Sequence, residues 1–391
     1  MRIGLVLPEA PQYSETFFNY KIKGLKESGF DVIVFSNKKE KKKFGYEIRS
    51  AYPVYENNIL KQMVMLVWVL NLTFIKTFKR SVKLFMLERE SGKKISESLK
   101  SIYINSHILT NVTDHLHFGY ATMALKRENT AEAIGSKMSV SLRGFDINVY
   151  PLKNPGCYDL LWKKADKVHS ISDYLYAKAL KFGLSSDKFY RKITPAIDIE
   201  SFRVKENPGM IGKKIKFLTI GRLSWIKDFE TAISAMKILK EKGLDFIYNI
   251  VGSGTELERL SFAVYQCGLQ DNVFFTGRKE HKEINHMMRE SDIYIQTSLQ
   301  EGFCVSVLEA QASGLLCIVS DADGLKENVR DGITGWVVKR REPGEFASKI
   351  EYVINLPEEK RKEISINARK RVEENFTIEK QNILFKEFFI S

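Results

Sequence analysis

Short apolar runs alternate along the chain with segments whose apolar residues follow a helical period. Residues 3–7 and 31–35 indicate buried strands, and residues 17–28 between them have the spacing of an amphipathic helix. The same alternation returns in the second half, where the strand-like run 215–220 leads into the helical segment 229–240. Strands that alternate with helices predict an α/β architecture with parallel sheets.

A polar segment with two glycines and a proline, residues 203–214, separates two such α/β halves. The length of 391 residues is enough for two domains, each with its own core. We therefore expect an N-terminal domain of residues 1–200 and a C-terminal domain of residues 201–375.

Two polar residues fall at predicted strand ends in the first half. Residues 122–133 indicate a helix, and residues 138–142 a strand that leads directly into Arg143. His117 and Arg143 each follow an apolar run, and open parallel sheets bind ligands at the carboxyl ends of their strands. A single histidine is usually structural, but a His and an Arg on consecutive strand ends favour a functional role.

Residues 59–91 have an unusual pattern. Residues 63–70 are uninterrupted apolar, but polar residues follow within about 20 positions, so the segment falls short of a membrane-spanning helix. Further on, a basic helical stripe lies beside an apolar one. The two stripes consist of Lys76, Lys79, Arg80 and Lys83, and of Ile75, Phe78, Val82, Phe85 and Met86. Such a helix either lies in a membrane interface or covers the first sheet with its lysines in water.

The formal net charge of +13 is unevenly distributed. Residues 1–200 contain 32 Lys and Arg against 20 Asp and Glu, an excess of 12, whereas residues 201–391 contain 29 against 28. This excess favours an anionic partner for the first half: a lipid surface, a phosphorylated acceptor or nucleic acid. The basic residues lack the interleaved aromatics of a recognisable nucleic-acid module, so we expect no nucleic-acid partner.

The cysteines and the N-terminus bear on the compartment. The four cysteines have no metal-ligand spacing, which favours reduced thiols in a cytosolic protein. The apolar run 1–7 is too short for a signal peptide and leads into a proline-rich turn. We expect a cytoplasmic protein, with peripheral attachment to the inner face of the plasma membrane as an open alternative.

The most informative stretch is residues 298–314, in which Glu301 and Glu309 have seven residues between them. Strand-like runs flank it, and it opens with a glycine turn before a short apolar helix. Free backbone N–H groups and the helix dipole favour an anion at such a helix start. The residues expected at that turn are Gly302, Phe303, Cys304 and Val305.

A bound diphosphate repels carboxylates, so the two glutamates must serve neutral parts of the ligand. Sugar and ribose hydroxyls fit, since a carboxylate can accept two O–H bonds at once. Such charge-assisted bonds contribute about 1.5–3 kcal/mol each. Arg222 and Lys227 precede the predicted helix 229–240, where a guanidinium fork and an ammonium can clamp a diphosphate.

The pattern Ser-x-x-Glu-Gly-Phe-x-x-x-x-Leu-Glu-Ala-x-Ala-x-Gly over residues 298–314 resembles the Glu-x7-Glu motif of the retaining glycosyltransferases of the GT-B fold, the family 4 group. The Ser-Glu-Thr-Phe turn at residues 14–17 is similar to that of bacterial polysaccharide glycosyltransferases of the colanic-acid type. The resemblance implies two Rossmann-like domains with parallel sheets facing a central cleft. It also implies that a C-terminal helix, within residues 376–391, packs back on the first domain.

The resemblance assigns roles residue by residue. It implies an N-terminal acceptor-binding domain and a C-terminal domain that binds the nucleotide sugar. Reacting groups and the pyrophosphate would be served by Glu301, Arg222, Lys227, His117 and Arg143. Further donor contacts would come from Gly302 to Val305, Glu309, Gly277, Arg278, Ser14 and Glu15. Many relatives have His where this chain has Arg143, so only the place of that residue carries over.

The resemblance implies transfer of a hexose, with retention of anomeric configuration, from a UDP- or GDP-linked sugar to a polysaccharide or lipid-linked oligosaccharide. No cofactor and no metal are expected, because Arg222, Lys227 and helix amides would neutralise the leaving diphosphate. The pair Asp321 and Asp323 falls in a turn after a strand and is expected to be structural. The alternatives are a GT-B epimerase or phosphorylase, and a basic nucleic-acid- or lipid-binding protein without enzymatic activity.

Overall fold

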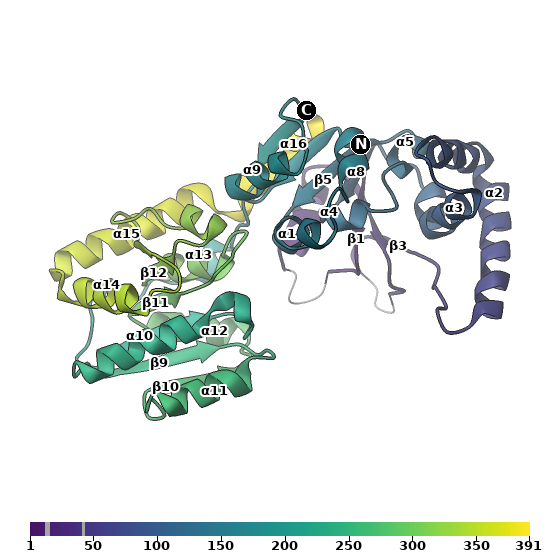
Figure 1. Ribbon diagram of the computed structural model, residues 1–391. Helices are drawn as coiled ribbons and strands as arrows, with labels where there is room; N and C mark the ends of the chain where they lie inside the picture. The colour runs from purple at the N-terminus through teal and green to yellow at the C-terminus, as the bar shows by residue number, and fades with distance from the viewer. Residues whose placement is uncertain (12–15, 41–43) are drawn as a thin grey trace. The chain divides into compact units, whose positions relative to one another are not determined.

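The computed structural model describes residues 1–11, 16–40 and 44–391, which form two compact units (Figure 1). Unit 1 consists of Met1–Ile193 together with Asn382–Ser391, and unit 2 consists of Thr194–Gln381. The chain therefore leaves unit 1 after one long segment and returns to it within its last helix, α16 (Ile378–Ile390). The first transition lies a few residues before the expected boundary at residue 200.

Unit 1 is built on a 7-stranded parallel sheet in the order β3-β2-β1-β4-β5-β6-β7. The strands are β1 (Arg2–Leu7), β2 (Asp31–Ser36), β3 (Glu47–Ser50), β4 (His115–Phe118), β5 (Lys137–Leu142), β6 (Lys167–Ser170) and β7 (Phe189–Lys192). The strand order reverses between β1 and β4, so the loops after these two strands diverge at the carboxyl edge, where such sheets bind ligands.

The helices of unit 1 connect these strands. They are α1 (Thr16–Glu27), α2 (Ile59–Glu90), α3 (Ile95–Leu109), α4 (Ala121–Ala124), α5 (Thr130–Ile134), α6 (Phe145–Asn148), α7 (Tyr150–Lys153), α8 (Asp159–Lys164) and α9 (Asp173–Lys181). The single helix predicted over residues 122–133 is wrong, because the chain turns between α4 and α5. Lys126 there has a φ of 66°, and the buried Arg127 donates a hydrogen bond of 2.8 Å to Asn37 Oδ1.

Unit 2 is built on a 6-stranded parallel sheet in the order β10-β9-β8-β11-β12-β13. Its strands are β8 (Ile215–Ile220), β9 (Phe246–Val251), β10 (Val273–Gly277), β11 (Ile293–Gln296), β12 (Leu316–Ser320) and β13 (Trp336–Val338). Its helices are α10 (Phe229–Glu241), α11 (Leu257–Gln266), α12 (His281–Glu290), α13 (Val305–Ala312), α14 (Pro343–Asn355) and α15 (Glu358–Asn375). Side chains of α10, α11 and α14 form one core with the sheet. The prediction of two parallel α/β sheets is confirmed.

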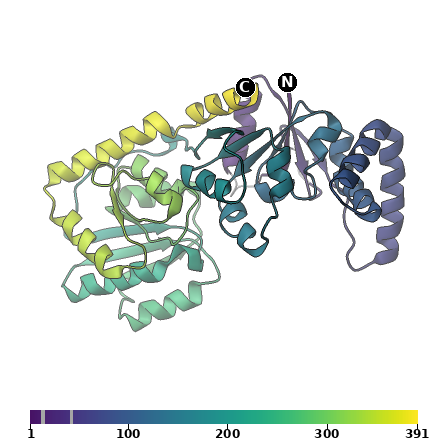
Figure 2. The ribbon, with the colours of Figure 1, turned by 45° about the horizontal axis from the view of Figure 1, so that its top comes forward.

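Helix α2 is long, is kinked at Thr77 and packs mainly against α3 (Figures 1 and 2). The basic stripe predicted on it loses one member, because the Arg80 guanidinium donates a hydrogen bond of 2.9 Å to the Leu109 carbonyl. That carbonyl ends α3, where a cation is favoured by the helix dipole. Arg80 therefore joins two helices, and its inclusion among the free surface charges was wrong.

The last helix completes the core of unit 1. Phe385, Phe388 and Phe389 of α16 lie in one cluster with residues of β1, β2 and α1. The ammonium of Lys167 donates a hydrogen bond of 2.9 Å to the Phe388 carbonyl. Residues more than 350 positions apart in the sequence thus share one apolar core.

We expect Phe388→Ala to destabilise unit 1 by about 3–5 kcal/mol, because truncating a fully buried phenylalanine loses apolar burial and leaves a cavity. Ile383→Ala on the same helix is the matched control, since Ile383 is 56% exposed. Denaturant unfolding followed by circular dichroism measures both. A Phe388 variant as stable as the Ile383 variant would show that the helix contributes little to the core.

Candidate functional site in unit 2

The strand order of unit 2 reverses between β8 and β11, and the loops that follow these two strands meet at the carboxyl edge of the sheet. Thr297 Oγ1 donates a hydrogen bond of 2.7 Å to the Asp228 carbonyl, and Leu299 N donates one of 2.8 Å to the Ile226 carbonyl. The loop after β8 is thereby held against the loop after β11. This is the position at which doubly wound sheets place ligands.

An ion pair joins the two loops. The ammonium of Lys227 contacts Glu301 Oε1, and the two side chains are only 18% and 12% exposed. Burial alone would lower the pKa of Lys227, but the adjacent Glu301 carboxylate outweighs it and the pKa is raised. Lys227 is therefore held charged at neutral pH, with two of its three N–H donors left for other acceptors.

A chain of hydrogen bonds behind Glu301 fixes its carboxylate. Ser298 Oγ donates to Glu301 Oε1 at 2.9 Å, Gln296 Nε2 donates to Ser298 Oγ at 2.7 Å, and Tyr294 donates to Gln296 Oε1 at 3.0 Å. These positioning residues were not predicted. The signal for them was present, because Tyr294, Gln296 and Ser298 alternate with Ile295 and Thr297 and so face one side of a strand.

Two glycines let the backbone close around this edge. A Cβ on Gly252, whose φ is 141°, would lie 1.9 Å from the Gly221 carbonyl oxygen. A Cβ on Gly324 would lie 2.0 Å from the Gly302 carbonyl oxygen, which brings the segment after β12 against the glutamate loop. No side chain can occupy these positions without moving the loops that carry Lys227 and Glu301.

Arg222 lies at the mouth of the site. Its side chain is exposed, makes no hydrogen bond or ion pair with any residue of the described chain, and is close enough to Lys227 to oppose that residue's charge. Two cations therefore converge at the edge of the sheet, one fixed and one exposed. The predicted pairing of Arg222 with Lys227 at one place is present.

The start of α13 offers fewer donors than expected. The N–H groups of Gly302 and Phe303 have no acceptor within the described residues, as expected for an anion-binding turn. Cys304 N, in contrast, donates a hydrogen bond of 3.0 Å to Asn328 Oδ1, so the expectation of a free amide there is wrong. Val305 begins the helix and is partly exposed.

Glu309 lies in α13, half-buried, and its carboxylate forms no hydrogen bond or ion pair within the described part of the chain. Burial raises the pKa of Glu309 to about 7. A carboxylate without a partner in such surroundings gains from any ligand hydroxyl that donates to it. Glu301 is already paired, whereas Glu309 is not.

Two other predicted positions lie at neighbouring strand ends. Gly277 ends β10 with a φ of 72°, and Arg278 Nε donates a hydrogen bond of 2.6 Å to Ser253 Oγ. Asp321 accepts hydrogen bonds from the backbone N and the Nε of Arg340, which supports the structural role predicted for it. Among the residues that the structure describes, no cluster of three or more His, Cys, Asp or Glu side chains could hold a metal ion.

His117 is not where sequence analysis placed it. It lies inside β4, fully buried, with Ser139 Oγ 2.8 Å from Nδ1, and with Lys21 Nζ and Ser141 Oγ 2.8 and 2.9 Å from Nε2. Burial and the charge of Lys21 hold the pKa of His117 well below its usual range. The expectation that His117 reaches a substrate is therefore wrong for this structure, because its ring is a neutral part of the core.

Arg143 does lie at a strand end. It follows β5, its Nε donates a hydrogen bond of 3.1 Å to the Gly119 carbonyl, and its guanidinium lies 4.1 Å from the Phe17 ring centroid. It therefore occupies the carboxyl edge of unit 1 beside the loop after β4. The predicted donor contacts Ser14 and Glu15 lie outside the described residues.

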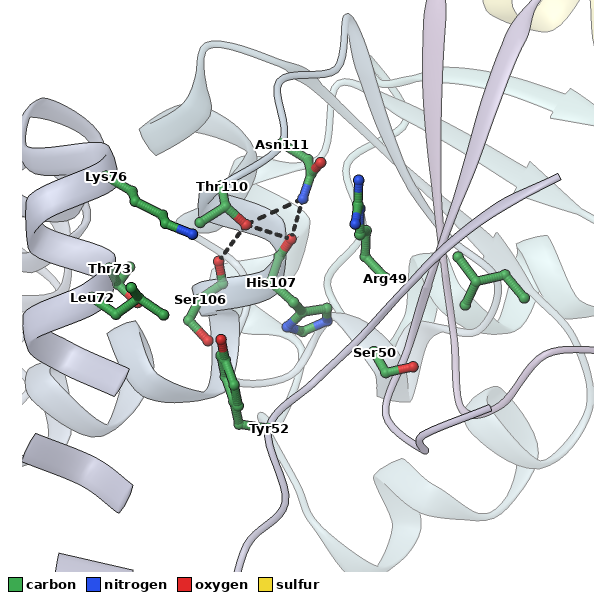
Figure 3. A pocket seen from close by; sticks show the side chains of 11 residues that line it. Arg49, Ser50, Tyr52, Leu72, Thr73, Lys76, Ser106, His107, Thr110 and Asn111 are labelled. Carbon is green, nitrogen blue, oxygen red and sulfur yellow. Dashed lines mark hydrogen bonds between the residues drawn. The ribbon is translucent and has the colours of Figure 1, made fainter. Parts of the chain in front are cut away.

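Unit 1 also contains a polar cavity of about 500 Å³ between β3, α2 and α3 (Figure 3). Its lining includes Arg49 and Lys76 on opposite sides, with Thr110 and Asn111 between them. The buried His107 also lines it, with both ring nitrogens unpaired, and burial followed by the charge of Arg127 lowers its pKa to about 3. Two cations, hydroxyls and a neutral imidazole suit a hydroxylated or phosphorylated group.

Two curated proteins show similarity over part of the chain. The putative colanic acid biosynthesis glycosyltransferase WcaL of Escherichia coli K12 is 25% identical over 269 residues, which is 66% of either chain. The UDP-Gal:alpha-D-GlcNAc-diphosphoundecaprenol alpha-1,3-galactosyltransferase of Escherichia coli is 28% identical over 51% of this chain and 53% of that protein. The matches thus cover less than two thirds of these relatives.

The fold is matched over the whole chain. Anabaena Alr3699/HepE, solved in complex with UDP and glucose, superimposes with a TM-score of 0.72 and 16% identity over 100% of this chain and 99% of that one. Residues 201–371, which carry Arg222, Lys227, Glu301 and Glu309, match the family described as Glycosyl transferases group 1. With its two parallel sheets the chain has the GT-B fold, its residues 201–371 match the group 1 glycosyltransferases, and over part of its length it is similar to glycosyltransferases of colanic acid and amylovoran biosynthesis.

Proposed function

We propose that the protein transfers a hexose from a nucleoside diphosphate sugar to a polysaccharide or lipid-linked oligosaccharide, with retention of anomeric configuration. The observation that carries the proposal is the Lys227–Glu301 ion pair at the strand reversal of unit 2, with Arg222 exposed beside it and Glu309 unpaired. Cations for a diphosphate and carboxylates for hydroxyls thus lie at one edge of one sheet.

In this proposal the diphosphate lies against Arg222, the remaining N–H donors of Lys227, and the free amides of Gly302 and Phe303. Positive charge fixed before the reaction stabilises the negative charge that develops on the leaving phosphate. These groups supply the charge that a divalent metal supplies in other transferases. The base of the nucleotide would lie near Gly277 and Arg278, at the end of β10.

The carboxylates take the neutral parts of the donor. Glu301 is held by Lys227 and Ser298 through one oxygen, Oε1, which leaves Oε2 for a hydroxyl of the transferred sugar. Glu309, without a partner, accepts the ribose hydroxyls. Such bonds contribute about 1.5–3 kcal/mol each, because the acceptor is charged.

The reaction step requires no separate protein base. The acceptor oxygen forms a bond to the anomeric carbon on the face from which the nucleoside diphosphate departs, as the bond from that carbon to the phosphate oxygen breaks. The acceptor proton passes to an oxygen of the leaving phosphate. This route fits a site in which the buried His117 cannot reach a ligand.

The acceptor is the less defined substrate. One relative is named for a diphosphoundecaprenol-linked acceptor and another for colanic acid biosynthesis, which supports a lipid-linked or polysaccharide acceptor here. Anabaena Alr3699/HepE was solved with UDP and glucose, which supports a UDP-linked donor. Calorimetric titration with UDP-glucose and GDP-mannose tests the donor directly, and a donor that is epimerised without any acceptor would indicate an epimerase instead.

We expect Glu309→Gln to raise the donor dissociation constant by roughly ten-fold or more, through loss of about 1.5–3 kcal/mol of charge-assisted bonding. Because hydroxyls donate to the ionised carboxylate, wild-type affinity should rise as the pH increases from about 6 to 8, through the pKa of about 7. The donor diphosphate stays ionised over this range. Calorimetry at several pH values measures both effects, and wild-type and variant profiles of equal slope would contradict the ribose assignment.

Arg222→Ala and Lys227→Ala should each slow transfer by 100-fold or more, in order of magnitude, because each removes a preorganised charge at the leaving phosphate. Lys349→Ala is the matched control, because it also removes a lysine ammonium but lies on α14, outside the site. The measurement consists of initial rates of sugar transfer, taken with and without EDTA. Activity that EDTA abolishes and magnesium restores would show that a metal, rather than these two cations, neutralises the diphosphate.

A further inference from the structure

The buried face of α2 is unusually polar for a surface helix. Beside the apolar Val69, Leu84 and Leu87, this face carries four buried polar residues, Thr73, Thr77, Ser81 and Glu88. Ser101 of α3 donates a hydrogen bond of 2.6 Å to Glu88 Oε1, and the Lys93 ammonium lies 2.5 Å from Glu88 Oε2. Hydroxyls and a paired carboxylate thus occupy positions where apolar side chains usually form the core.

Helix α2 lies at the edge of unit 1 (Figures 1 and 2), and the face opposite its buried side is apolar and exposed. Ile75 and Leu60 are 83% and 78% exposed. The exposed apolar residues of α2 are Ile59, Leu60, Met63, Val64, Val67, Trp68, Ile75, Phe78 and Met86. A contiguous apolar face of this length is rare on a soluble monomer and marks a surface that a partner or a membrane covers.

Cations flank this apolar face. Lys61, Lys76, Lys79 and Lys83 are exposed, and none forms an ion pair within the described residues. The sequence between Ile59 and Leu87 contains no Asp or Glu. The surface therefore combines apolar burial with attraction to anions, the combination that favours an anionic membrane interface.

An apolar cavity continues the same surface at the first turns of α2. It has a volume of about 510 Å³, and its lining includes Val54, Ile59, Met63 and Leu66. Tyr52 and Trp68 lie edge to face beside this region, with ring centroids 5.7 Å apart. Trp is enriched at the water-facing margin of a bilayer, where its ring is half buried in lipid.

We propose that α2 lies in the plane of an anionic lipid bilayer, with Leu60, Val64, Ile75 and Phe78 among the acyl chains and the flanking lysines at the phosphates. The surface is formed by unit 1 alone and makes no use of the donor site in unit 2. It adds membrane attachment to the proposed transfer and stands if the donor assignment fails.

Two other arrangements of α2, a membrane span and a dimer of the chain, fit this apolar face less well. Within the described residues α2 is the one helix long and apolar enough to cross a membrane by length and composition, so the prediction that this segment falls short of a spanning helix is wrong on those two criteria. Of its most apolar 18-residue stretch, 11% is buried. A span would take Thr73, Ser81 and Glu88 away from α3 and into hydrocarbon, which is costly. A second copy of the chain would bring like-charged lysines together, with no acidic residue between Ile59 and Leu87 to offset them.

Co-sedimentation of the full chain with vesicles tests the proposal. Vesicles of phosphatidylglycerol and phosphatidylcholine should bind the protein, vesicles of phosphatidylcholine alone should bind it at least roughly ten-fold more weakly, and high salt should release part of it. Acyl-brominated lipids should quench Trp68 fluorescence, and the quenching should be lost in Trp68→Phe. Alkaline carbonate should extract the bound protein, and failure to extract it would show a spanning helix and overturn the proposal.

Matched variants separate apolar from charge contributions. Leu60→Ser with Val64→Ser and Ile75→Ser should weaken binding by roughly ten-fold or more. Phe262→Ser with Ile333→Ser and Ile366→Ser, which are 57%, 53% and 50% exposed in unit 2, should not weaken it. Lys76→Gln, Lys79→Gln and Lys83→Gln should weaken binding by roughly five-fold each, with Lys213→Gln, Lys282→Gln and Lys362→Gln as controls.

All these positions are exposed, so the variants should fold, and circular dichroism checks this. Equal vesicle binding by the α2 variants and their controls would overturn the proposal. The proposal would also be overturned if analytical ultracentrifugation without lipid showed a dimer that the Leu60, Val64 and Ile75 substitutions dissociate into monomers.

Discussion

The ion pair between Lys227 and Glu301 is the interaction on which the candidate site depends. It joins the loops after two strands, β8 and β11, that lie side by side in the sheet. The last residue of β8, Ile220, and the first residue of β11, Ile293, are 73 positions apart in the sequence, so the pair holds together segments that are distant along the chain. Both side chains are largely buried, and removing one partner of such a pair leaves an uncompensated charge, at a cost of about 3–5 kcal/mol. The pair therefore holds a charged group ready at the sheet edge before any ligand arrives.

The interior of unit 1 also contains polar side chains that hold one another in place, but they lie in the core. Lys21, His117 and His169 lie together in the core, and Lys21 is 4.0 Å from the Phe385 ring centroid. Burial, followed by the charge of Arg143, lowers the pKa of Lys21 well below its usual range. Hydrogen bonds link His117 to Lys21 and, through Ser141, to His169. This network of unit 1 lies in the core, whereas the Lys227–Glu301 pair of unit 2 lies at the carboxyl edge of its sheet beside the exposed Arg222.

The sequence was sufficient for the two sheets and for the glutamate loop, because strand periodicity and a glycine turn are local signals. It was not sufficient for His117, because burial of that ring depends on α16, whose Phe388 and Phe389 pack against it from the far end of the chain. The free amide expected at Cys304 was wrong for a similar reason, since Asn328, its partner, follows 24 residues later. Local patterns place backbone elements, whereas long-range contacts decide which side chains remain accessible.

Periodicity also showed two stripes on α2 without showing which of them faces inward. The inward face is neither the basic nor the apolar stripe but a third, in which Val69, Leu84 and Leu87 alternate with polar residues. The hydroxyls of Thr73 and Thr77 donate to carbonyls of the same helix, those of Val69 and Thr73. Small side chains let α3 approach closely, and Arg80 is drawn inward by the carbonyl at the end of α3. The apolar stripe is left outside by this packing.

The uneven charge of the chain can be related to two surfaces, the candidate donor site of unit 2 and the exposed face of α2. In unit 2 the cation nearest the strand reversal is matched by a carboxylate, and residues 201–391 carry 29 basic against 28 acidic residues, so a site for a diphosphate does not need a strongly basic domain. The proposed donor site in unit 2 therefore does not require the excess of 12 positive charges in residues 1–200. Part of it lies on α2 as lysines without ion pairs among the described residues, beside an apolar face that water alone does not stabilise. An anionic interface satisfies both features at once, which neither a soluble saccharide nor a purely apolar partner would do.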